Sequence, residues 1–167
     1  VDDTCRVNSV TCIAPTKTFN LAGLQTAAVS AENSILHHRM WRQLNTDEVA
    51  EPNAFAIQAT IAAFQYGEEW LDELREYVEK NKQYVTEFLQ EKIPLIHPVA
   101  GDATYLMWLD CRKITESGRQ FAKFIRKTSG LYVSGGNQYG KGGEGFLRVN
   151  VATSKLVVED GMQRLYE

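Results

Sequence analysis

Apolar residues recur at three- and four-residue steps between Asn53 and Lys92, which is the strongest periodic signal in the chain. The residues that share one helical face at this spacing are Leu71, Leu74, Val78, Val85, Phe88 and Leu89. A single helix of about 40 residues would be about 60 Å long, which exceeds the needs of a compact domain of this size. We therefore predict a break near Gly67 and a helix that links two domains.

The residues after this helix predict a compact α+β unit. Pro94 and Pro98 end the helix, and Tyr105–Asp110 is an apolar run typical of a buried strand. Leu131–Val133 predicts a further short strand. A last strand and helix complete the order strand, helix, strand, strand, helix.

An amphipathic helix is predicted between these strands, from about Ser117 to Thr128. Phe121, Phe124 and Ile125 are expected to point inward. Gly130 is placed to end the helix, because glycine readily adopts the left-handed conformation of a helix C-terminus.

The segment from Phe146 to Val151 alternates in the manner of a strand with two distinct faces. Phe146, Arg148 and Asn150 share one face, and Leu147, Val149 and Val151 share the other. Thr153 or Ser154 is then expected to cap a helix that ends near Tyr166.

The first fifty residues predict the last pieces of a different sheet. Val7–Ile13 is rich in β-branched residues and is predicted to be a strand that ends at Ala14-Pro15. The small residues of Leu21–Ala31 are compatible with a strand or with a turn and helix, and periodicity does not distinguish these.

The composition is close to that of an average globular domain. The 167 residues include 18 Lys and Arg against 21 Asp and Glu, which gives a formal net charge of -3. No basic cluster is present, so neither a nucleic-acid nor a membrane-surface partner is expected. The longest apolar run, Ala54 to Phe64, is too short to cross a bilayer.

Cys5, Cys12 and Cys111 form an odd set without a C-x-x-C pair. This pattern argues against both a disulfide framework and a tetrahedral zinc site, and scattered thiols are typical of a reducing cytoplasm. His37 and His38 are adjacent and would point to different faces of a helix, so no metal site is predicted.

Lys17 is the first candidate for chemistry, within the segment APTKTFNLAG from Ala14 to Gly23. A lysine among small and apolar residues at a strand end can be desolvated, and it is then nucleophilic enough to form a Schiff base. Spacing alone favours an ordinary solvated loop lysine, so the residues by themselves leave both interpretations open.

Arg148 is the second candidate, in the segment FLRVNVATS from Phe146 to Ser154. A planar guanidinium in mid-strand can donate two parallel hydrogen bonds to a carboxylate, which a lysine cannot do. Without further context, a solvent-exposed strand arginine remains the more common alternative.

Gly135–Lys141 satisfies G-x-x-x-x-G-K, the start of a phosphate-binding loop. However, Gly142 stands where a Ser or Thr should hold Mg²⁺, and the segment leads into a strand instead of a helix. Nucleotide binding is therefore not predicted.

These segments resemble the class I/II aminotransferase family, and in particular its cystathionine beta-lyase-like (C-S lyase) branch. The residues around Lys17 are similar to the family's pyridoxal-phosphate lysine motif A-P-S-K-T-F-N-L-A-G, with Thr16 in place of Ser. Phe146–Thr153 is similar to its F-L-R-V-N-V-A-T motif. Trp70–Leu74 and Tyr105–Asp110 match its linker helix and small-domain strand, so the resemblance extends in order over essentially the whole chain.

The resemblance implies an α/β fold, the C-terminal part of a fold that binds pyridoxal 5'-phosphate (PLP). Residues 1–52 would end the large cofactor-binding domain, 53–92 would form the linker helix, and 93–167 would form the small α+β domain. Lys17 would form the Schiff base with PLP beside Thr16, and Arg148 would bind the substrate α-carboxylate. Ser134–Gly145 would be a mobile loop near the substrate entrance, its glycines supplying backbone flexibility.

The resemblance further implies a cytoplasmic, homodimeric PLP enzyme acting on amino acids. A C-S β-lyase, which releases a thiol, pyruvate and ammonia, is the leading expectation, and an aminotransferase is the alternative. Many aminotransferases carry a phosphate-binding arginine eight residues after the lysine, and Gln25 at that position favours the lyase. A non-catalytic dimerisation or interaction module remains a hypothesis of another class.

The family's other cofactor contacts lie earlier in its sequence than the residues matched here. These contacts are an acidic residue on the pyridine nitrogen, an aromatic residue on the ring and a glycine-containing phosphate loop. The chain is therefore expected to be the C-terminal part of a longer enzyme and to be inactive by itself.

Overall fold

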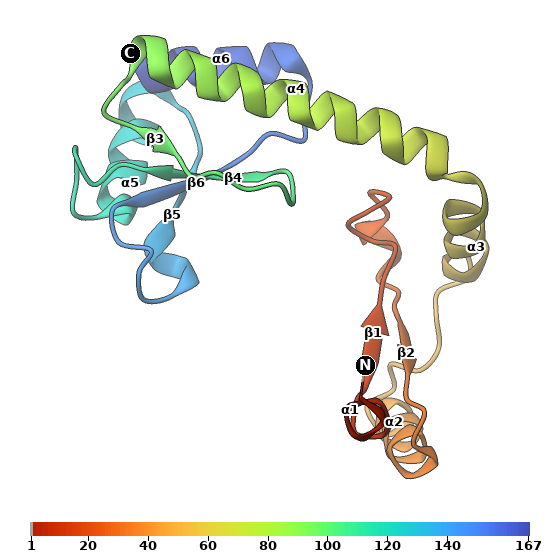
Figure 1. The fold of residues 1–167 in the computed structure, drawn as a ribbon. Coiled ribbons are helices and arrows are strands. Elements are labelled where there is room, and N and C mark those ends of the chain that lie inside the picture. The colour runs from red at the N-terminus through yellow and green to blue at the C-terminus, as the bar shows by residue number, and fades with distance from the viewer. Residues whose placement is uncertain (1) are drawn as a thin grey trace. The chain divides into compact units, whose positions relative to one another are not determined.

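The computed structural model describes residues 2–167, and the chain folds into two compact units (Figure 1). Unit 1 is Val1–Glu73 and unit 2 is Leu74–Glu167. The division falls within the long helix α4 (Glu68–Lys92). The domain limits at residues 52 and 92 that the resemblance implies stay a prediction.

Unit 1 combines a two-stranded sheet with helices. Its elements are α1 (Asp3–Val7), β1 (Thr11–Ile13), the 3₁₀ turn η1 (Ala22–Leu24), β2 (Ala28–Ser30), α2 (Ser34–Thr46), α3 (Ala56–Tyr66) and the start of α4. β1 and β2 pair antiparallel, with Cys12 opposite Val29.

The predicted strand Val7–Ile13 is correct only from Thr11 onward. Asp2 accepts a hydrogen bond from the backbone N of Thr4 at 3.2 Å and caps α1, which takes Val7 into a helix. The ambiguous segment Leu21–Ala31 contains both a 3₁₀ turn and a strand.

The predicted break near Gly67 is confirmed. α3 ends at Tyr66, and Gly67 N donates to Ala63 O at 2.9 Å before α4 begins at Glu68. A Cβ atom at position 67 would lie 2.7 Å from Cε1 of Phe19, so only glycine lets this ring pack against the junction.

Unit 2 contains a four-stranded antiparallel sheet with strand order β3-β4-β6-β5. The elements after α4 are β3 (His97–Pro98), β4 (Leu106–Asp110), α5 (Gly118–Ser129), β5 (Ser134–Gly135), the 3₁₀ turn η2 (Gly136–Tyr139), β6 (Phe146–Asn150) and α6 (Lys155–Tyr166). The predicted α+β unit is present, but the strand expected at Leu131–Val133 lies at Ser134–Gly135, and the two-residue strand β3 was not predicted.

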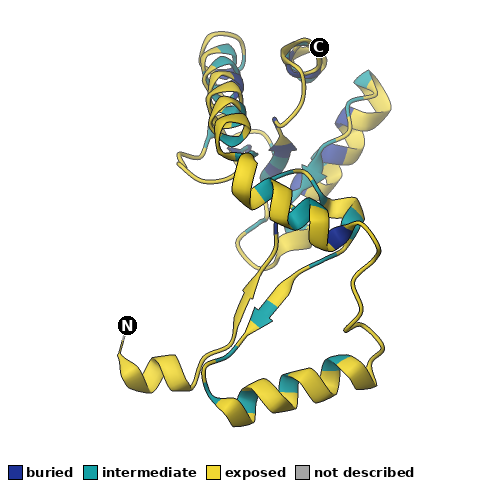
Figure 2. Ribbon diagram, turned by 90° about the vertical axis from the view of Figure 1, so that its right-hand side faces the viewer, coloured by how far each residue is buried: buried dark blue, intermediate teal, exposed yellow. Residues whose placement is uncertain are grey.

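The main hydrophobic core lies in unit 2. Alternate residues of the two central strands point into it, namely Met107, Leu109, Leu147 and Val149. The helices add Val85, Leu89, Ala122, Ile125, Val158 and Met162. Figure 2 shows the buried positions concentrated on this sheet and its helices, whereas few positions of unit 1 are buried.

The amphipathic helix predicted at 117–128 is α5, displaced by one residue. Ser117 Oγ accepts a hydrogen bond from Gln120 N at 3.4 Å, and Gly130 ends the helix with φ 75°. Ile125 is buried as expected, but Phe124 is 61% exposed, so its predicted inward orientation is wrong. Phe124 lies immediately beside Ile125, and the turn of the helix carries it away from the sheet.

The long helix α4 supplies the cap of α6. Ser154 occupies the N-cap position, but its side chain makes no capping bond, and Lys155 N instead donates to the Tyr77 hydroxyl at 2.8 Å. One turn further along α4, the buried Asn81 amide donates to Val151 O at 2.9 Å and to Thr153 O at 3.0 Å. These bonds fix the β6–α6 connection against α4.

Leu109→Ala is expected to lower the free energy of unfolding by about 2 to 5 kcal/mol, because Leu109 is fully buried and its truncation leaves a cavity. Leu156→Ala is the matched control, since Leu156 is 76% exposed and should change stability by no more than about 0.5 kcal/mol. Chemical denaturation measures both. Equal effects of the two substitutions would contradict the assigned core.

Candidate active site

Lys17 lies in a hydrogen-bonded turn that follows β1. Phe19 N donates to Pro15 O at 2.9 Å, and Leu21 N donates to Thr16 O at 3.0 Å. Pro15 is buried and Thr16 is half-buried, which anchors the turn beneath Lys17. The turn therefore presents the lysine side chain from a fixed base.

Aromatic packing within unit 1 also holds this turn. The Phe19 ring lies edge-to-face on Phe64, with centroids 5.4 Å apart, and stacks with Trp70 at 6.3 Å. Asn20 has φ 54°, a left-handed conformation that asparagine tolerates better than most residues. Phe19 thus ties the lysine turn to the α3–α4 junction.

The Lys17 side chain is exposed, so residues 2–167 do not supply the desolvation that the sequence suggested. Within this described part of the chain, Lys17 has neither a hydrogen bond nor an ion pair. A primary amine without a protein partner is free to bond covalently to a carbonyl compound. The residues present therefore fit a cofactor that is attached through an aldehyde, as PLP is.

Gln25 follows η1 in a left-handed conformation, φ 47°, and borders a cleft of about 350 Å³ in unit 1. The other walls come from Pro15, the segment 49–52 and α3. Among the described residues that line this cleft, Glu51 alone is charged. The cleft therefore offers no cation to a phosphate group at the position of Gln25.

Arg148 lies in the middle of β6, opposite Trp108 of β4 on one side and Ser134 of β5 on the other. Its neighbours Leu147 and Val149 point into the core, so strand alternation places Arg148 on the opposite face of the sheet. The two predicted faces of this strand are confirmed.

The Arg148 guanidinium stacks on the ring of Tyr139, with Cζ 3.9 Å from the ring centroid. Trp108 packs edge-to-face against the same ring, with centroids 5.4 Å apart. The Arg148 guanidinium forms no hydrogen bond or ion pair with any residue in the described range. Its N–H groups are therefore available for a bidentate pair of hydrogen bonds to a carboxylate.

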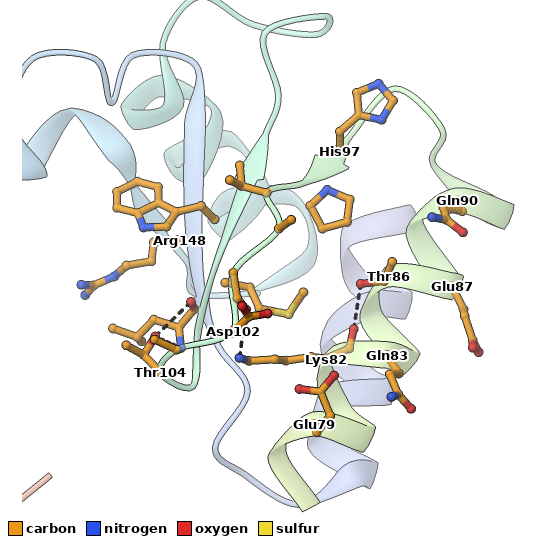
Figure 3. Close-up of a pocket in the computed structure, with 18 residues that line it drawn as sticks. Glu79, Lys82, Gln83, Thr86, Glu87, Gln90, His97, Asp102, Thr104 and Arg148 are labelled. Carbon is orange, nitrogen blue, oxygen red and sulfur yellow. Dashed lines mark hydrogen bonds between the residues drawn. The ribbon is translucent and has the colours of Figure 1, made fainter. Parts of the chain in front are cut away.

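Arg148 and Trp108 also line a cleft of about 760 Å³, whose other walls are α4 and the β3–β4 connection. Figure 3 shows Arg148 across the sheet from the polar side chains of α4. The charged residues around the cleft are Glu79, Lys82, Glu87, Asp102 and Arg148. Both signs of charge are therefore present among the residues that line the cleft.

The glycine-rich segment 134–145 is not built as a phosphate loop. The four-residue turn η2 follows β5, and Gly142 N donates to Glu144 Oε2 at 2.8 Å. A Cβ atom on Gly136 would lie 2.2 Å from Gly143 O, so these two glycines allow close backbone contact. Tight packing explains why glycine stands at these two positions, and the mobility of the loop stays a prediction.

Asp110 and Arg112 form a rigid corner at the end of β4. Arg112 donates from Nε to Asp110 Oδ1 at 2.9 Å and from Nη2 to Oδ2 at 2.7 Å. These bonds lower the pKa of Asp110 from its usual 3.8 to about 2. Burial raises the pKa of the adjacent Cys111 thiol to about 12, which marks this cysteine as a core residue and not a nucleophile.

The candidate site residues lie in different units, with Thr16 and Lys17 in unit 1 and Arg148 in unit 2.

His37 and His38 lie on α2, and residues 2–167 contain no group of three or more His, Cys, Asp or Glu side chains suited to a metal ion. No helix in that range is long and apolar enough to span a membrane.

Sequence reasoning missed Tyr139, the ring on which Arg148 stacks. Its one local signal is an aromatic residue within a glycine-rich segment, and that signal does not identify its partner. The sequence also did not predict the register of β4 against β6, which places Trp108 directly opposite Arg148.

Comparison with known proteins defines the class to which these features belong. Residues 5–165 match the model of the family "Aminotransferase class I and II", so the chain belongs to this family. The chain is 38% identical over 157 residues to cystathionine beta-lyase PatB of Bacillus subtilis, covering 94% of this chain and 41% of that protein. Protein MalY of Escherichia coli is 31% identical, with 89% of this chain and 38% of that protein covered.

Solved structures agree with this assignment. Cystalysin from Treponema denticola, which contains a pyridoxal 5'-phosphate cofactor, superposes with a TM-score of 0.93 at 25% identity, covering 99% of this chain and 42% of its own. The PLP-bound C-S lyase from Staphylococcus hominis superposes with a TM-score of 0.80 at 31% identity, covering 94% and 41%. The chain thus has the fold of the C-terminal part of these enzymes and spans about two fifths of the length of its curated relatives.

Asp110→Asn is expected to lower the free energy of unfolding at pH 7, because the bonds from Arg112 favour the charged carboxylate. The folded-state pKa is below the unfolded value, so this stabilisation is complete above about pH 4 and is lost as the pH falls toward 2. Denaturation of wild type and variant between pH 7 and pH 3 measures the difference. Glu116→Gln, at an exposed position, is the control, and a difference that does not narrow with falling pH would refute the assignment.

Proposed function

We propose that the full-length protein containing this chain is a PLP-dependent C-S β-lyase that acts on amino acids such as cystathionine. The observation that carries the amino-acid substrate is the Arg148 guanidinium, which stacks on Tyr139 and has no hydrogen bond or ion pair within residues 2–167. The similarity to cystathionine beta-lyase PatB and to the Staphylococcus hominis C-S lyase supports the reaction type. The activity is proposed for the full-length protein because the chain spans only part of these relatives.

Lys17 is proposed to hold the cofactor covalently through Nζ, with Thr16 in contact from the preceding position. The exposed, unpartnered amine on an anchored turn supports this role. When bound, PLP accepts the electron pair that remains when the substrate Cα–H bond breaks. The Lys17 amine, once displaced by the amino group of the substrate, accepts the Cα proton as a general base.

Arg148 is proposed to bind the substrate α-carboxylate in both of the reactions under consideration. Its planar guanidinium supplies two parallel donors, which define the orientation of the carboxylate as well as its position. A fixed carboxylate restricts rotation of the amino acid and directs its Cα–H bond.

β-Elimination and transamination differ after the Cα proton has been removed. In elimination the Cβ–S bond breaks and the sulfur leaves as a thiolate. The three-carbon aminoacrylate that remains is then hydrolysed to pyruvate and ammonia. In transamination the Lys17 amine would return the proton to a carbon of the cofactor, and the amino group would then pass to a 2-oxo acid. Gln25, in a cleft wall without a cation, supports the lyase over those aminotransferases that bind phosphate with an arginine there.

A cytoplasmic homodimer is proposed for the full-length protein. Two of the three free cysteines, Cys5 and Cys12, are exposed, which suits a reducing compartment. Unit 1 exposes large apolar side chains, including Ile35, Trp41, Phe55 and Tyr66, which require cover by further protein surface. Light scattering of the full-length protein measures its oligomeric state, and a monomer would exclude the dimer.

The full-length enzyme is expected to release pyruvate from cystathionine without any added 2-oxo acid. Lys17→Ala should abolish this release together with the visible absorbance band of bound PLP. Borohydride reduction followed by peptide mass spectrometry should locate the cofactor on Lys17 in the wild type. Strict dependence on a 2-oxo acid would assign an aminotransferase instead, and a protein without a PLP band would leave only the non-catalytic module.

Arg148→Lys is expected to weaken binding of the substrate carboxylate by about 1.5 to 3 kcal/mol, because a point charge replaces a bidentate fork. This corresponds to an increase in KM of about 10- to 150-fold. Arg126→Lys is the matched control, since Arg126 stacks on the exposed Tyr132 away from the cleft. An unchanged KM in Arg148→Lys would remove Arg148 from the proposed site.

A further inference from the structure

The ring of Tyr139 is the one aromatic surface against which the Arg148 guanidinium stacks in the described chain. We propose that Tyr139 is a positioning residue that holds Arg148 in the plane required to bind the substrate carboxylate. This inference rests on the proposed function, because it assumes that Arg148 binds that carboxylate. It adds a residue from outside the strand, which neither the lysine motif nor the arginine motif contains.

Stacking covers one flat face of the guanidinium and leaves its N–H-bearing edge open. With Cζ 3.9 Å from the ring centroid, one flat face of the group is covered by Tyr139. The N–H groups point outward in the plane of the guanidinium, so stacking leaves them free for a carboxylate. Since no described residue accepts a hydrogen bond from the Arg148 guanidinium, the ring is the main restraint on this group. Removal of the ring would let the long side chain sample other rotamers.

The Tyr139 ring is itself held on two sides. Trp108, from the neighbouring strand, meets it edge-to-face with centroids 5.4 Å apart. Gln138 Nε2 donates to the Tyr139 hydroxyl at 3.0 Å. The face that contacts Arg148 depends on the ring and not on the hydroxyl, so a phenylalanine should serve in its place.

The backbone that carries Tyr139 is attached to α5 and to the glycine-rich loop. Asn137 Oδ1 accepts a hydrogen bond from Arg119 N at 2.8 Å, in the first turn of α5. Gly136 lies in close backbone contact with Gly143. The ring is thus presented from a restrained turn, as a positioning role requires.

The decisive experiment compares Tyr139→Leu and Tyr139→Phe in the full-length, PLP-loaded enzyme with cystathionine as substrate. Tyr139→Leu is expected to raise KM about 2- to 30-fold, the range of a cation–π contact, with kcat changed less than about twofold. Tyr139→Phe should restore KM toward the wild-type value. Tyr132→Leu is the matched control, because it removes the ring under Arg126 on an exposed surface and should leave KM unchanged.

A pair of competing ligands shows whether the effect acts through the carboxylate. S-benzyl-L-cysteine and S-benzylcysteamine differ only in that group, so Tyr139→Leu should weaken competition by the first and not by the second. In an Arg148→Lys background, Tyr139→Leu should add little, because the two residues act as one unit. Equal loss for both ligands, or full additivity, would overturn the positioning role.

Further outcomes separate this inference from the proposed function. If Arg148→Lys raises KM while Tyr139→Leu does not, the positioning role fails and the carboxylate site remains. If Arg148→Lys has no effect, the carboxylate site fails and this inference fails with it. A phenylalanine variant as impaired as the leucine variant would also overturn the role of the ring face. Should Tyr139→Leu fail to fold, Asn137→Ala releases the turn while keeping the ring, and an unchanged KM in that variant contradicts the inference.

Discussion

The strict alternation of β6 is the constraint on which unit 2 depends. Leu147 and Val149 have to enter the core between the sheet and its helices, and this requirement turns Arg148 to the other face. A shift in register by one residue would bury the guanidinium and expose two core side chains. The free energy that stabilises the fold therefore also determines on which face the candidate carboxylate site is built.

The long helix α4 connects this strand to the rest of unit 2 through buried polar bonds. Val85 and Leu89 contribute apolar area, while Asn81 satisfies two carbonyl groups just after β6 and Tyr77 caps α6. A buried amide is costly unless its hydrogen bonds are made, so these contacts specify one arrangement of helix and strand. The end of β6 is thereby held in place.

The two candidate cations have different kinds of support. Lys17 stands on a short turn whose backbone bonds and aromatic anchor fix the base of the side chain, while its amine is free. The head group of Arg148 is itself fixed by stacking, with its donors free. This difference suits the roles proposed for them, since an amine that forms and breaks a bond has to move, whereas a carboxylate-binding group benefits from preorganisation.

The sequence by itself determined those features that depend on residues within a few positions of one another. The break at Gly67, the helix between Ser117 and Gly130, the two faces of β6 and the motifs around Lys17 and Arg148 all follow from local periodicity, capping and residue type. The inward orientation of Phe124 was wrong because a local pattern does not show where the core lies. The strand at Val7 was wrong because the run of β-branched residues outweighed a local signal, the Asp2 cap on Thr4. Only the tertiary structure decided that Tyr77 caps a helix 78 residues further along, and that Tyr139 and Trp108 surround Arg148. These contacts join segments distant in the chain, and their partners are selected by sheet register and loop packing, which no local pattern encodes.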